Sequence, residues 1–169
     1  AGIGYSRRPS YIGEELDYTN SLSPRIGVHL IGNQSTVCQF SLSANLSYNH
    51  SSNSLRDDNS TITQQTGAQV RVNFLKHAYF ETNYAYYLYH SFSYAGGDVD
   101  THTWNLSLGV KLFKNRSGDI SLTVYDILNR NESFTSSMMS DYVTNNWSRM
   151  FGRYWTIGIG YKFNKTGKL

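Results

Sequence analysis

Histidine is the side chain of this sequence best suited to ligate a metal ion or to transfer protons near neutral pH. The five histidines are His29, His50, His77, His90 and His102. No two of them have the H-x-x-x-H spacing that presents two ligands on one helix face, and the lone Cys38 cannot supply the paired thiolates of a zinc site. The sequence therefore predicts no metal site built on histidine or cysteine.

Acidic side chains in the polar stretches are the second possible source of ligands. Two pairs, Asp57 with Asp58 and Asp98 with Asp100, could approach Ca²⁺, but neither stretch offers the set of about six oxygens that a calcium site needs. We interpret both pairs as solvated loop charges.

Asp126 and Asn129, in the motif D-I-L-N, come where a strand pattern gives way to a long polar stretch. Their side chains could contact a ligand or a cation. The favoured interpretation is an Asx-type turn, in which the side-chain oxygen bonds the nearby backbone.

Nucleophilic catalysis by serine would need a base held beside the hydroxyl group. Serine is abundant, and Asp100 and His102 lie near the end of an expected strand, but the G-x-S-x-G elbow is absent. We predict no catalytic residue, no cofactor and no enzymatic activity. A cluster of four tyrosines could stack sugars, or could instead pack at a membrane interface or in the interior. Its members are Tyr84, Tyr86, Tyr87 and Tyr89.

The composition limits the kind of protein that carries these residues. The 169 residues suit one domain, and 16% of them are charged, against about 25% in ordinary soluble domains. The net charge of +3 comes from scattered lysines and arginines, so we expect no nucleic-acid partner. No run of about 18 apolar residues occurs, so the sequence predicts no transmembrane helix.

Alternation of apolar with small or polar residues is the main structural signal. In the stretch 153–163, R-Y-W-T-I-G-I-G-Y-K-F, every second residue from Trp155 to Phe163 is large and apolar, which is the period of a β-strand. Similar stretches predict eight strands, at 2–8, 25–31, 37–49, 67–74, 79–94, 104–112, 120–124 and 153–163. Short turns are expected at 32–35, 75–78 and 114–118, and long loops at 9–23, 50–60, 95–100 and 127–152.

The lengths of these connections alternate along the chain. In an antiparallel meander, alternate connections share one end of the sheet, so short turns fall at one end and long loops at the other. Outer-membrane barrels have this asymmetry, with short periplasmic turns and longer extracellular loops. The expected fold class is therefore an all-β, antiparallel, up-and-down transmembrane β-barrel, with about eight strands in this chain and a periplasmic C-terminus.

Three features favour a membrane barrel over a soluble one, in which the apolar face would lie inside. Aromatic residues gather near the strand ends, the apolar stripes match a bilayer span of roughly 9–11 residues, and the opposite face is mainly Ser, Asn, Gln, Gly and Thr. The residues expected to face outer-membrane lipid are Leu106, Leu108, Val110, Trp155, Ile157 and Ile159.

Three motifs carry a family resemblance: L-F-K-N at 112–115, S-L-T-V-Y-D-I-L-N-R-N at 121–131 and F-G-R-Y-W-T-I-G-I-G-Y-K-F-N at 151–164. From residue 105 on, the chain resembles the C-terminal part of Bacteroidetes-type outer-membrane β-barrel proteins, which are relatives of TonB-dependent receptors. The resemblance implies a receptor or transporter-type barrel wall in the bacterial outer membrane and a partner plug domain, which family members usually carry at their N-terminus. It also implies an assembly signal, read by the barrel-assembly machinery and carried by Thr156, Gly158, Tyr161 and Phe163.

The expected inward face bears on the extent of the barrel. Its side chains are mostly small, and its charges are chiefly Arg25, Arg71, Glu81 and Lys111, so Glu81 can pair with at most one of the three cations. An eight-stranded barrel instead needs an interior filled by side chains. We therefore expect residues 1–169 to form a single β-barrel domain that is the C-terminal part of a longer barrel. Two alternatives stay open: a soluble β-barrel that binds a small apolar ligand, and a self-contained eight-stranded outer-membrane adhesin or enzyme.

Overall fold

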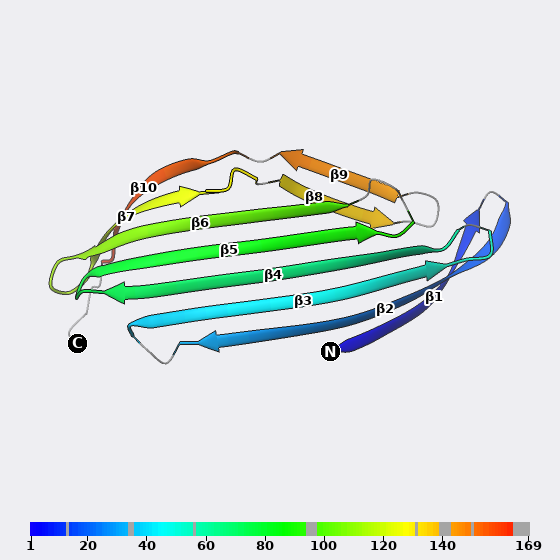
Figure 1. Ribbon diagram of the computed structural model, residues 1–169, viewed down its shortest axis with the longest axis horizontal. Helices are drawn as coiled ribbons and strands as arrows, with labels where there is room; N and C mark the ends of the chain where they lie inside the picture. The colour runs from blue at the N-terminus through cyan, green and yellow to red at the C-terminus, as the bar shows by residue number, and fades with distance from the viewer. Residues whose placement is uncertain are drawn as a thin grey trace.

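The computed structural model describes residues 1–12, 14–33, 36–55, 57–93, 98–130, 132–138, 143–149 and 151–163 (Figure 1). Its strands are β1 (Gly2–Ile12), β2 (Glu15–Gly32), β3 (Cys38–Ser52), β4 (Asn59–Phe74), β5 (Ala78–Ser91), β6 (Val99–Leu112), β7 (Gly118–Tyr125), β8 (Glu132–Met138), β9 (Val143–Arg149) and β10 (Tyr154–Tyr161). No helix long and apolar enough to cross a membrane occurs among these described residues. The predicted all-β class is confirmed.

Eight of the strands form one antiparallel sheet in the order β1-β2-β3-β4-β5-β6-β7-β10. Each strand pairs with the next along the chain, except that β10 lies beside β7 while β8 and β9 form a separate hairpin. Within the described ranges, β1 pairs with β2 alone and β10 with β7 alone. The antiparallel meander is therefore confirmed, but the sheet is not closed into a barrel, so the transmembrane barrel stays a prediction.

The connections that join β2 to β3, β4 to β5 and β6 to β7 are short and share one end of the sheet, as predicted. We call this end the turn end, and the opposite end the loop end. The last two connections reverse tightly through left-handed backbone, at Leu75 (φ 59°), Phe113 (φ 67°) and Arg116 (φ 55°).

The long loop predicted at 9–23 is wrong. There β1 continues to Ile12 and β2 begins at Glu15, so the two strands form an extended hairpin. Polar and aromatic cross-strand pairs stabilise it: the Arg7 guanidinium lies 4.3 Å from the centre of the Tyr18 ring, and the Tyr5 hydroxyl donates to Asn20 Oδ1 at 3.2 Å. Polar pairs such as Arg7 with Asn20 interrupt the apolar alternation of this hairpin, so the sequence pattern there is weak.

Two other predicted loops are shorter or more ordered than expected. Strand β4 extends back to Asn59, which reduces the loop at 50–60 to residues 53–58. The region 127–152, predicted to be one long loop, contains the hairpin of β8 and β9. The chain thus has ten strands in the described ranges, of which eight form the main sheet.

Side chains alternate between the two faces of the sheet, and the strand register keeps rows of one kind together. Leu108 pairs with Phe80 on one side and Leu122 on the other, which continues an apolar row across three strands. The next row, through Ser107 and Thr123, is polar. Across these strands, therefore, one face of the sheet is apolar and the other is polar.

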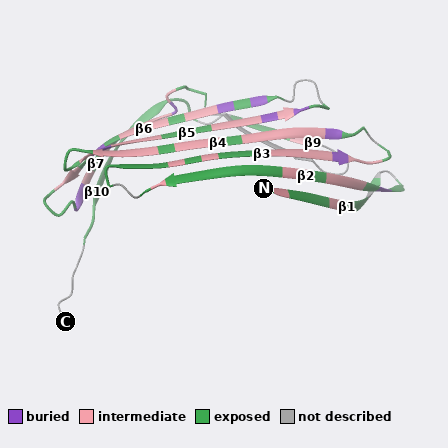
Figure 2. Cartoon of the chain, turned by 60° about the horizontal axis from the view of Figure 1, so that its bottom comes forward, coloured by how far each residue is buried: buried purple, intermediate pink, exposed green. Residues whose placement is uncertain are grey.

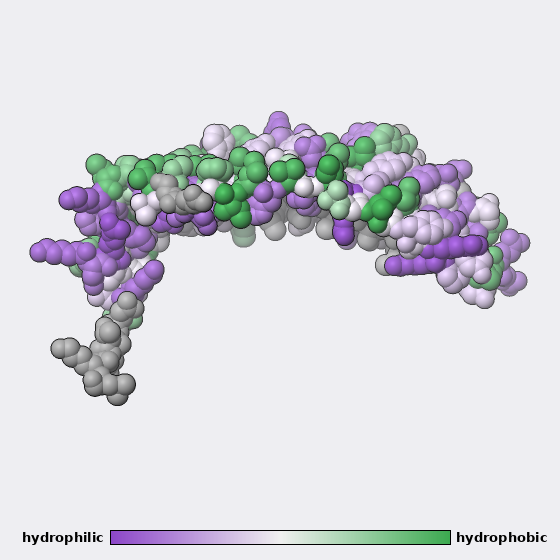
Figure 3. Space-filling view, turned by 90° about the horizontal axis from the view of Figure 1, so that it is seen from below, coloured by the Kyte–Doolittle hydropathy of each residue, from purple (hydrophilic) through white to green (hydrophobic). Residues whose placement is uncertain are grey.

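The sheet is curved, and Figure 3 shows it edge-on as an arch with hydrophobic residues along its convex side. Buried residues lie mainly near the strand ends (Figure 2). Side chains converge on the concave side of a curved sheet, and the register places the buried strand residues on the same face as Ser107 and Thr123. The buried strand side chains are Asp17, Ser51, Asn59, Tyr79, Tyr89, Ser91, Val99 and Thr101. The polar face is therefore concave and the apolar face convex.

Candidate functional site

The convex face carries a belt of apolar side chains. We define the belt by Ile26, Val28, Leu30, Phe40, Leu42, Ala44, Leu46, Ala68, Val70, Val72, Phe80, Tyr84, Trp104, Leu106, Leu108, Val110, Ile120, Leu122, Val124, Trp155, Ile157 and Ile159. Much of it is uncovered: Leu108 is 53% exposed, Ile157 64% and Ile159 82%. All six residues predicted to face lipid lie in this belt.

The belt crosses the strands obliquely. Ile26, the belt residue of β2 nearest the loop end, pairs with Leu46, which pairs with Gln64. The same row continues through Leu88 to Asp100. On β6 this position lies outside the belt, which begins there at Trp104. The apolar stripe thus moves toward the turn end as it passes from β2 to β6.

Aromatic and polar groups border the belt toward its loop end. The Trp104 indole donates to Thr82 Oγ1 at 2.8 Å, and the Tyr84 hydroxyl lies 2.7 Å from His102 Nδ1. The ring centres of Tyr86 and His102 are 4.7 Å apart. The polar tips of Trp104 and Tyr84 thus each have a partner, which is the arrangement that aromatic residues adopt at a boundary between apolar and aqueous surroundings.

The four neighbouring tyrosines do not form one cluster. Tyr84 and Tyr86 lie on the convex face, whereas Tyr87 and Tyr89 point to the concave face, where Tyr89 packs against Val99. A single stacking platform for a sugar, which the sequence left open, is therefore not assembled from these four residues.

The histidines at the loop end pair with the acidic residues that the sequence placed in loops. His90 Nδ1 lies 2.7 Å from Asp98 Oδ1, and His102 Nε2 lies 3.4 Å from Asp100 Oδ2. His50 Nε2 is 3.8 Å from Asp58 Oδ2. In the described part of the chain, no three His, Cys, Asp or Glu side chains come together as metal ligands.

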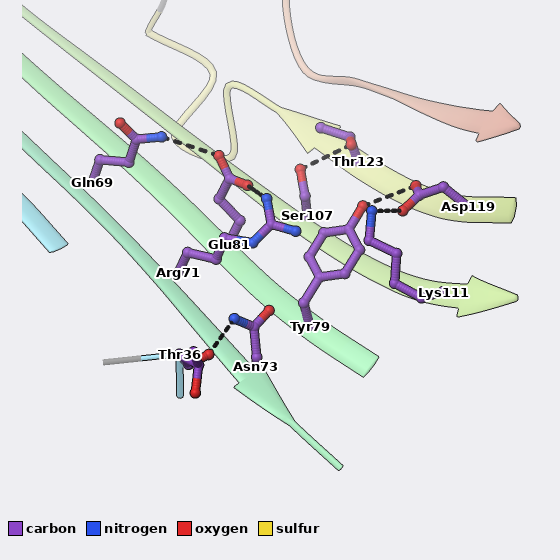
Figure 4. Close-up of polar contacts among 10 residues, drawn as sticks. All are labelled: Thr36, Gln69, Arg71, Asn73, Tyr79, Glu81, Ser107, Lys111, Asp119 and Thr123. Atoms are coloured by element: carbon purple, nitrogen blue, oxygen red, sulfur yellow. Dashed lines mark hydrogen bonds and ion pairs between the residues drawn. The ribbon is translucent and has the colours of Figure 1, made fainter. Parts of the chain in front are cut away.

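A network of charged groups lies on the concave face near the turn end (Figure 4). Arg71 Nη1 lies 3.3 Å from Glu81 Oε2, and Gln69 donates to the other oxygen of Glu81 at 3.1 Å. Lys111 Nζ lies 2.7 Å from Asp119 Oδ2. The network has two positive and two negative charges, so its formal charge is zero.

Asp119 corrects the expectation that Glu81 is the only negative charge on this face. Gly118 was predicted to belong to a turn, but β7 begins there, and Asp119 therefore alternates with Ser121 on the concave face. The register places Asp119 directly opposite Lys111. The sequence could have predicted this position. Ser121 was expected on the inward face, and a residue two positions earlier on the same strand lies on the same face.

Tyr79 ties the two ion pairs together. The Arg71 guanidinium lies 4.2 Å and Lys111 Nζ 5.4 Å from the centre of its ring, and its hydroxyl donates to Asp119 Oδ1 at 3.0 Å. The ring can lie flat across β6 because its partner there is Gly109, where even a methyl group would meet the ring. The cluster thus depends on a glycine that presents no side chain.

The residues of the expected assembly signal divide between the faces of β10. Thr156 and Gly158 pair with Thr123 and Ser121 on the concave side. Tyr161 lies on the convex side, and its ring centre is 4.5 Å from that of Phe163, which is 87% exposed. The strand end therefore presents an uncovered aromatic pair.

Asp126 and Asn129 form the turn that leads out of β7. Asp126 is 1% exposed and accepts a hydrogen bond from the Arg130 backbone N–H at 3.1 Å. Asn129 Oδ1 accepts from the Arg153 backbone N–H at 2.9 Å. Asp126 bonds nearby backbone, as the turn interpretation expects, whereas Asn129 bonds backbone that lies 24 residues further along the chain.

Asp17 is a structural anchor at the loop end, beyond the belt, that the sequence did not identify. Its carboxylate accepts from the Tyr18 backbone N–H at 2.7 Å, the Ser54 hydroxyl at 2.8 Å and the Leu55 backbone N–H at 3.3 Å. Burial raises the pKa of Asp17, but these hydrogen bonds outweigh burial and hold that pKa below its ordinary value. Asp17 thereby joins loop 53–58 to the β1–β2 hairpin.

Comparisons with protein families, with curated proteins and with solved structures found no match. The function is therefore inferred from the geometry of the chain itself. That geometry is an open antiparallel meander with an exposed apolar belt on its convex face and a polar concave face with two ion pairs.

Proposed function

We propose that this chain forms part of the wall of a receptor or transporter-type β-barrel in a bacterial outer membrane. The observation that carries the proposal is the polarity of the curved sheet, which is apolar on the outside of the curve and polar on the inside. A soluble barrel needs the reverse, because its apolar side chains form the core. A barrel in lipid needs an outward apolar band and a polar interior.

The oblique course of the belt supports the same proposal. Strands of a membrane barrel tilt by about 35–45° from the membrane normal, so an apolar band parallel to the membrane must cut across the hydrogen-bonded rows. The row from Ile26 to Asp100, which leaves the belt between β2 and β6, has this property.

The proposal assigns a role to each part of the sheet. The belt contacts outer-membrane lipid, the concave face lines the interior, and the turn end lies in the periplasm. The outer edges of β1 and β10, which have no neighbouring strand in the described ranges, pair with further strands of a larger barrel, because open edges in lipid leave backbone groups without hydrogen bonds. On the family resemblance, β10 with Tyr161 and Phe163 is read by the assembly machinery, and a plug domain fills the interior.

Adjacent residues on β3 allow a direct test in lipid. In a Cys38→Ser background, Ala44→Cys places a spin label on the belt and Ser43→Cys places one on the concave face at nearly the same depth. We expect the label at 44 to be more accessible to oxygen, which partitions into lipid, and the label at 43 to a water-soluble nickel chelate. The measurement is power-saturation EPR in bilayers.

Two outcomes would contradict the proposal. Equal exposure of both labels to the nickel chelate would mean that the belt does not meet lipid. A label at 43 in apolar surroundings with a label at 44 in water would instead support the soluble barrel. A chain that stays monodisperse and folded without detergent would point the same way.

A further inference from the structure

A cavity of about 450 Å³ opens on the concave face at the turn end. Three connections form its walls: Val37 beside β3, Lys76 and His77 in the β4–β5 turn, and Arg116 in the β6–β7 turn. Tyr79 and Lys111 form its floor. Its volume lies within the range of roughly 300–1,000 Å³ that is usual for small-ligand sites.

The charges around this cavity are unbalanced. Lys76, Lys111 and Arg116 line it, and within the described residues only Lys111 has a carboxylate partner, Asp119. Lys76 and Arg116 form no ion pair in the described ranges. With Asp119 counted, the site has a formal charge of +2, in contrast to the neutral network beside it.

The cations belong to separate elements: Lys76 to the β4–β5 turn, Lys111 to β6 and Arg116 to the β6–β7 turn. Lys111 is fixed by Asp119 and by the Tyr79 ring, so its ammonium group has one direction already set. Arg116 is held on left-handed backbone, and its N–H donates to the Phe113 carbonyl at 3.0 Å, which orients the turn. Cations that converge from separate elements can share one multivalent anion, because each donates to a different oxygen.

From this cavity we infer a binding site for a small anion that bears phosphate or carboxylate groups. Lys76 and Arg116 supply the uncompensated charge, and Lys111 supplies a positioned donor. The inference needs only three neighbouring turns, so it goes beyond the proposed barrel and does not depend on its closure. The site lies on the concave face, away from the belt, which favours a free anion over a lipid headgroup.

Inorganic pyrophosphate is the probe, titrated by calorimetry into the full chain in a maltoside detergent, which has no phosphate headgroup. The test variant is Lys76→Gln with Arg116→Asn, since asparagine tolerates left-handed backbone. The matched control is Lys114→Gln, which removes a charge from the same turn as Arg116 but does not line the cavity. Circular dichroism checks that every variant keeps its β structure.

We expect the double variant to bind pyrophosphate about tenfold or more weakly, while the control stays within about twofold of the original chain. Affinity should fall as salt is raised. Absence of binding by the original chain would overturn the inference, and so would equal losses in the double variant and the control. Neither result would bear on the spin-label test of the barrel.

Mixed micelles with phosphatidylglycerol distinguish the two sources of a phosphate group. If a lipid headgroup occupied the site, the lipid would weaken pyrophosphate binding by the original chain more than binding by the double variant. We expect the lipid to affect pyrophosphate binding by the original chain and by the double variant equally. An unequal effect would assign the site to lipid and overturn the assignment to a free anion.

Discussion

Gly109 decides the geometry of the charged network on the concave face. Gly109→Ala puts a methyl group into the Tyr79 ring, which must move and release its contacts with Asp119 and Arg71. We expect a loss of about 1–3 kcal/mol in the free energy of unfolding, as for other overpacked sites. The measurement is the urea midpoint of chain refolded into bilayers.

The matched control is Gly160→Ala on the same face. A methyl group there meets only the Asp119 Cβ, at 3.7 Å, which is an ordinary contact. Its effect should stay within about 0.5 kcal/mol. Equal losses at Gly109 and Gly160 would show that the Tyr79 ring does not need its flat position across β6.

Asp17 gives the loop end a dependence on pH. Because its folded pKa is lowered, the hydrogen bonds of its carboxylate stabilise the fold above the ordinary value of 3.8 and are lost as pH falls through the lower folded pKa. We expect the amides of Ser54 and Leu55 to lose protection from hydrogen exchange below that value, after correction for the intrinsic rate.

Asp17→Asn should weaken this protection at pH 5 and remove its pH dependence. Asp57→Asn is the control, since Asp57 lies in the same loop with an exposed side chain. If Asp17→Asn kept the original pH profile, another group would hold loop 53–58 in place.

At the scale of the strand, alternation predicts the central part of each main-sheet strand. There one face is apolar and the other polar, so apolar side chains recur at every second residue. It fails beyond the belt. The β1–β2 hairpin continues through pairs such as Arg7 with Asn20, whose polar side chains interrupt the repeat. In the hairpin of β8 and β9 the apolar residues Phe134, Met138, Val143 and Trp147 are spaced four apart rather than two, so the repeat is too sparse to indicate a strand.

The functional surfaces also divide into a part that alternation predicts and a part that it does not. The lipid-facing residues predicted on β6 and β10 all fall in the belt, because burial and lipid contact both select apolar side chains. The Lys111–Asp119 pair and the cavity depend on register, and register follows from where each turn begins. Because the predicted start of β7 was two residues too late, Asp119 was not assigned to the concave face.

Arginine substitutions on neighbouring positions of β6 test the assignment of faces. Leu108→Arg puts a charge into the belt and should cost roughly 2–4 kcal/mol at the bilayer midplane. Ser107→Arg points to the concave face and should cost clearly less. Both variants are compared by equilibrium folding into bilayers, and equal costs would contradict a lipid-facing belt.

At the scale of the whole molecule, the two edges of the described sheet carry backbone groups that need hydrogen-bond partners. The outward N–H and C=O groups of β1 and β10 have no strand beside them in the described ranges. In lipid such groups cost several kcal/mol each, so we expect these edges to find partners once the sheet enters a bilayer. The partner is a further strand, the opposite edge or a second copy.

Hydrogen exchange measured by NMR in bilayers tests this expectation. Alternate amides of β1 and β10 that point away from the sheet should be as protected as the amides of β4, which is paired on both sides. The hairpin of β8 and β9, outside the main sheet, is the reference for exposed edges. Fast exchange at both outer edges in lipid would mean that the sheet does not insert as proposed.

The hairpin of β8 and β9 also affects how the chain reaches this sheet. Most neighbouring strands are joined by a few residues, but β7 and β10 are separated by roughly 28, and loop-closure entropy rises by about 0.6 kcal/mol for each doubling of length. Because Glu132 pairs with Arg149, a hairpin that forms first brings the base of this long insertion together. Only the two short segments that flank the hairpin must then be closed for β10 to pair with β7. Formation of the local hairpin therefore lowers the entropic cost of adding the last strand of the sheet.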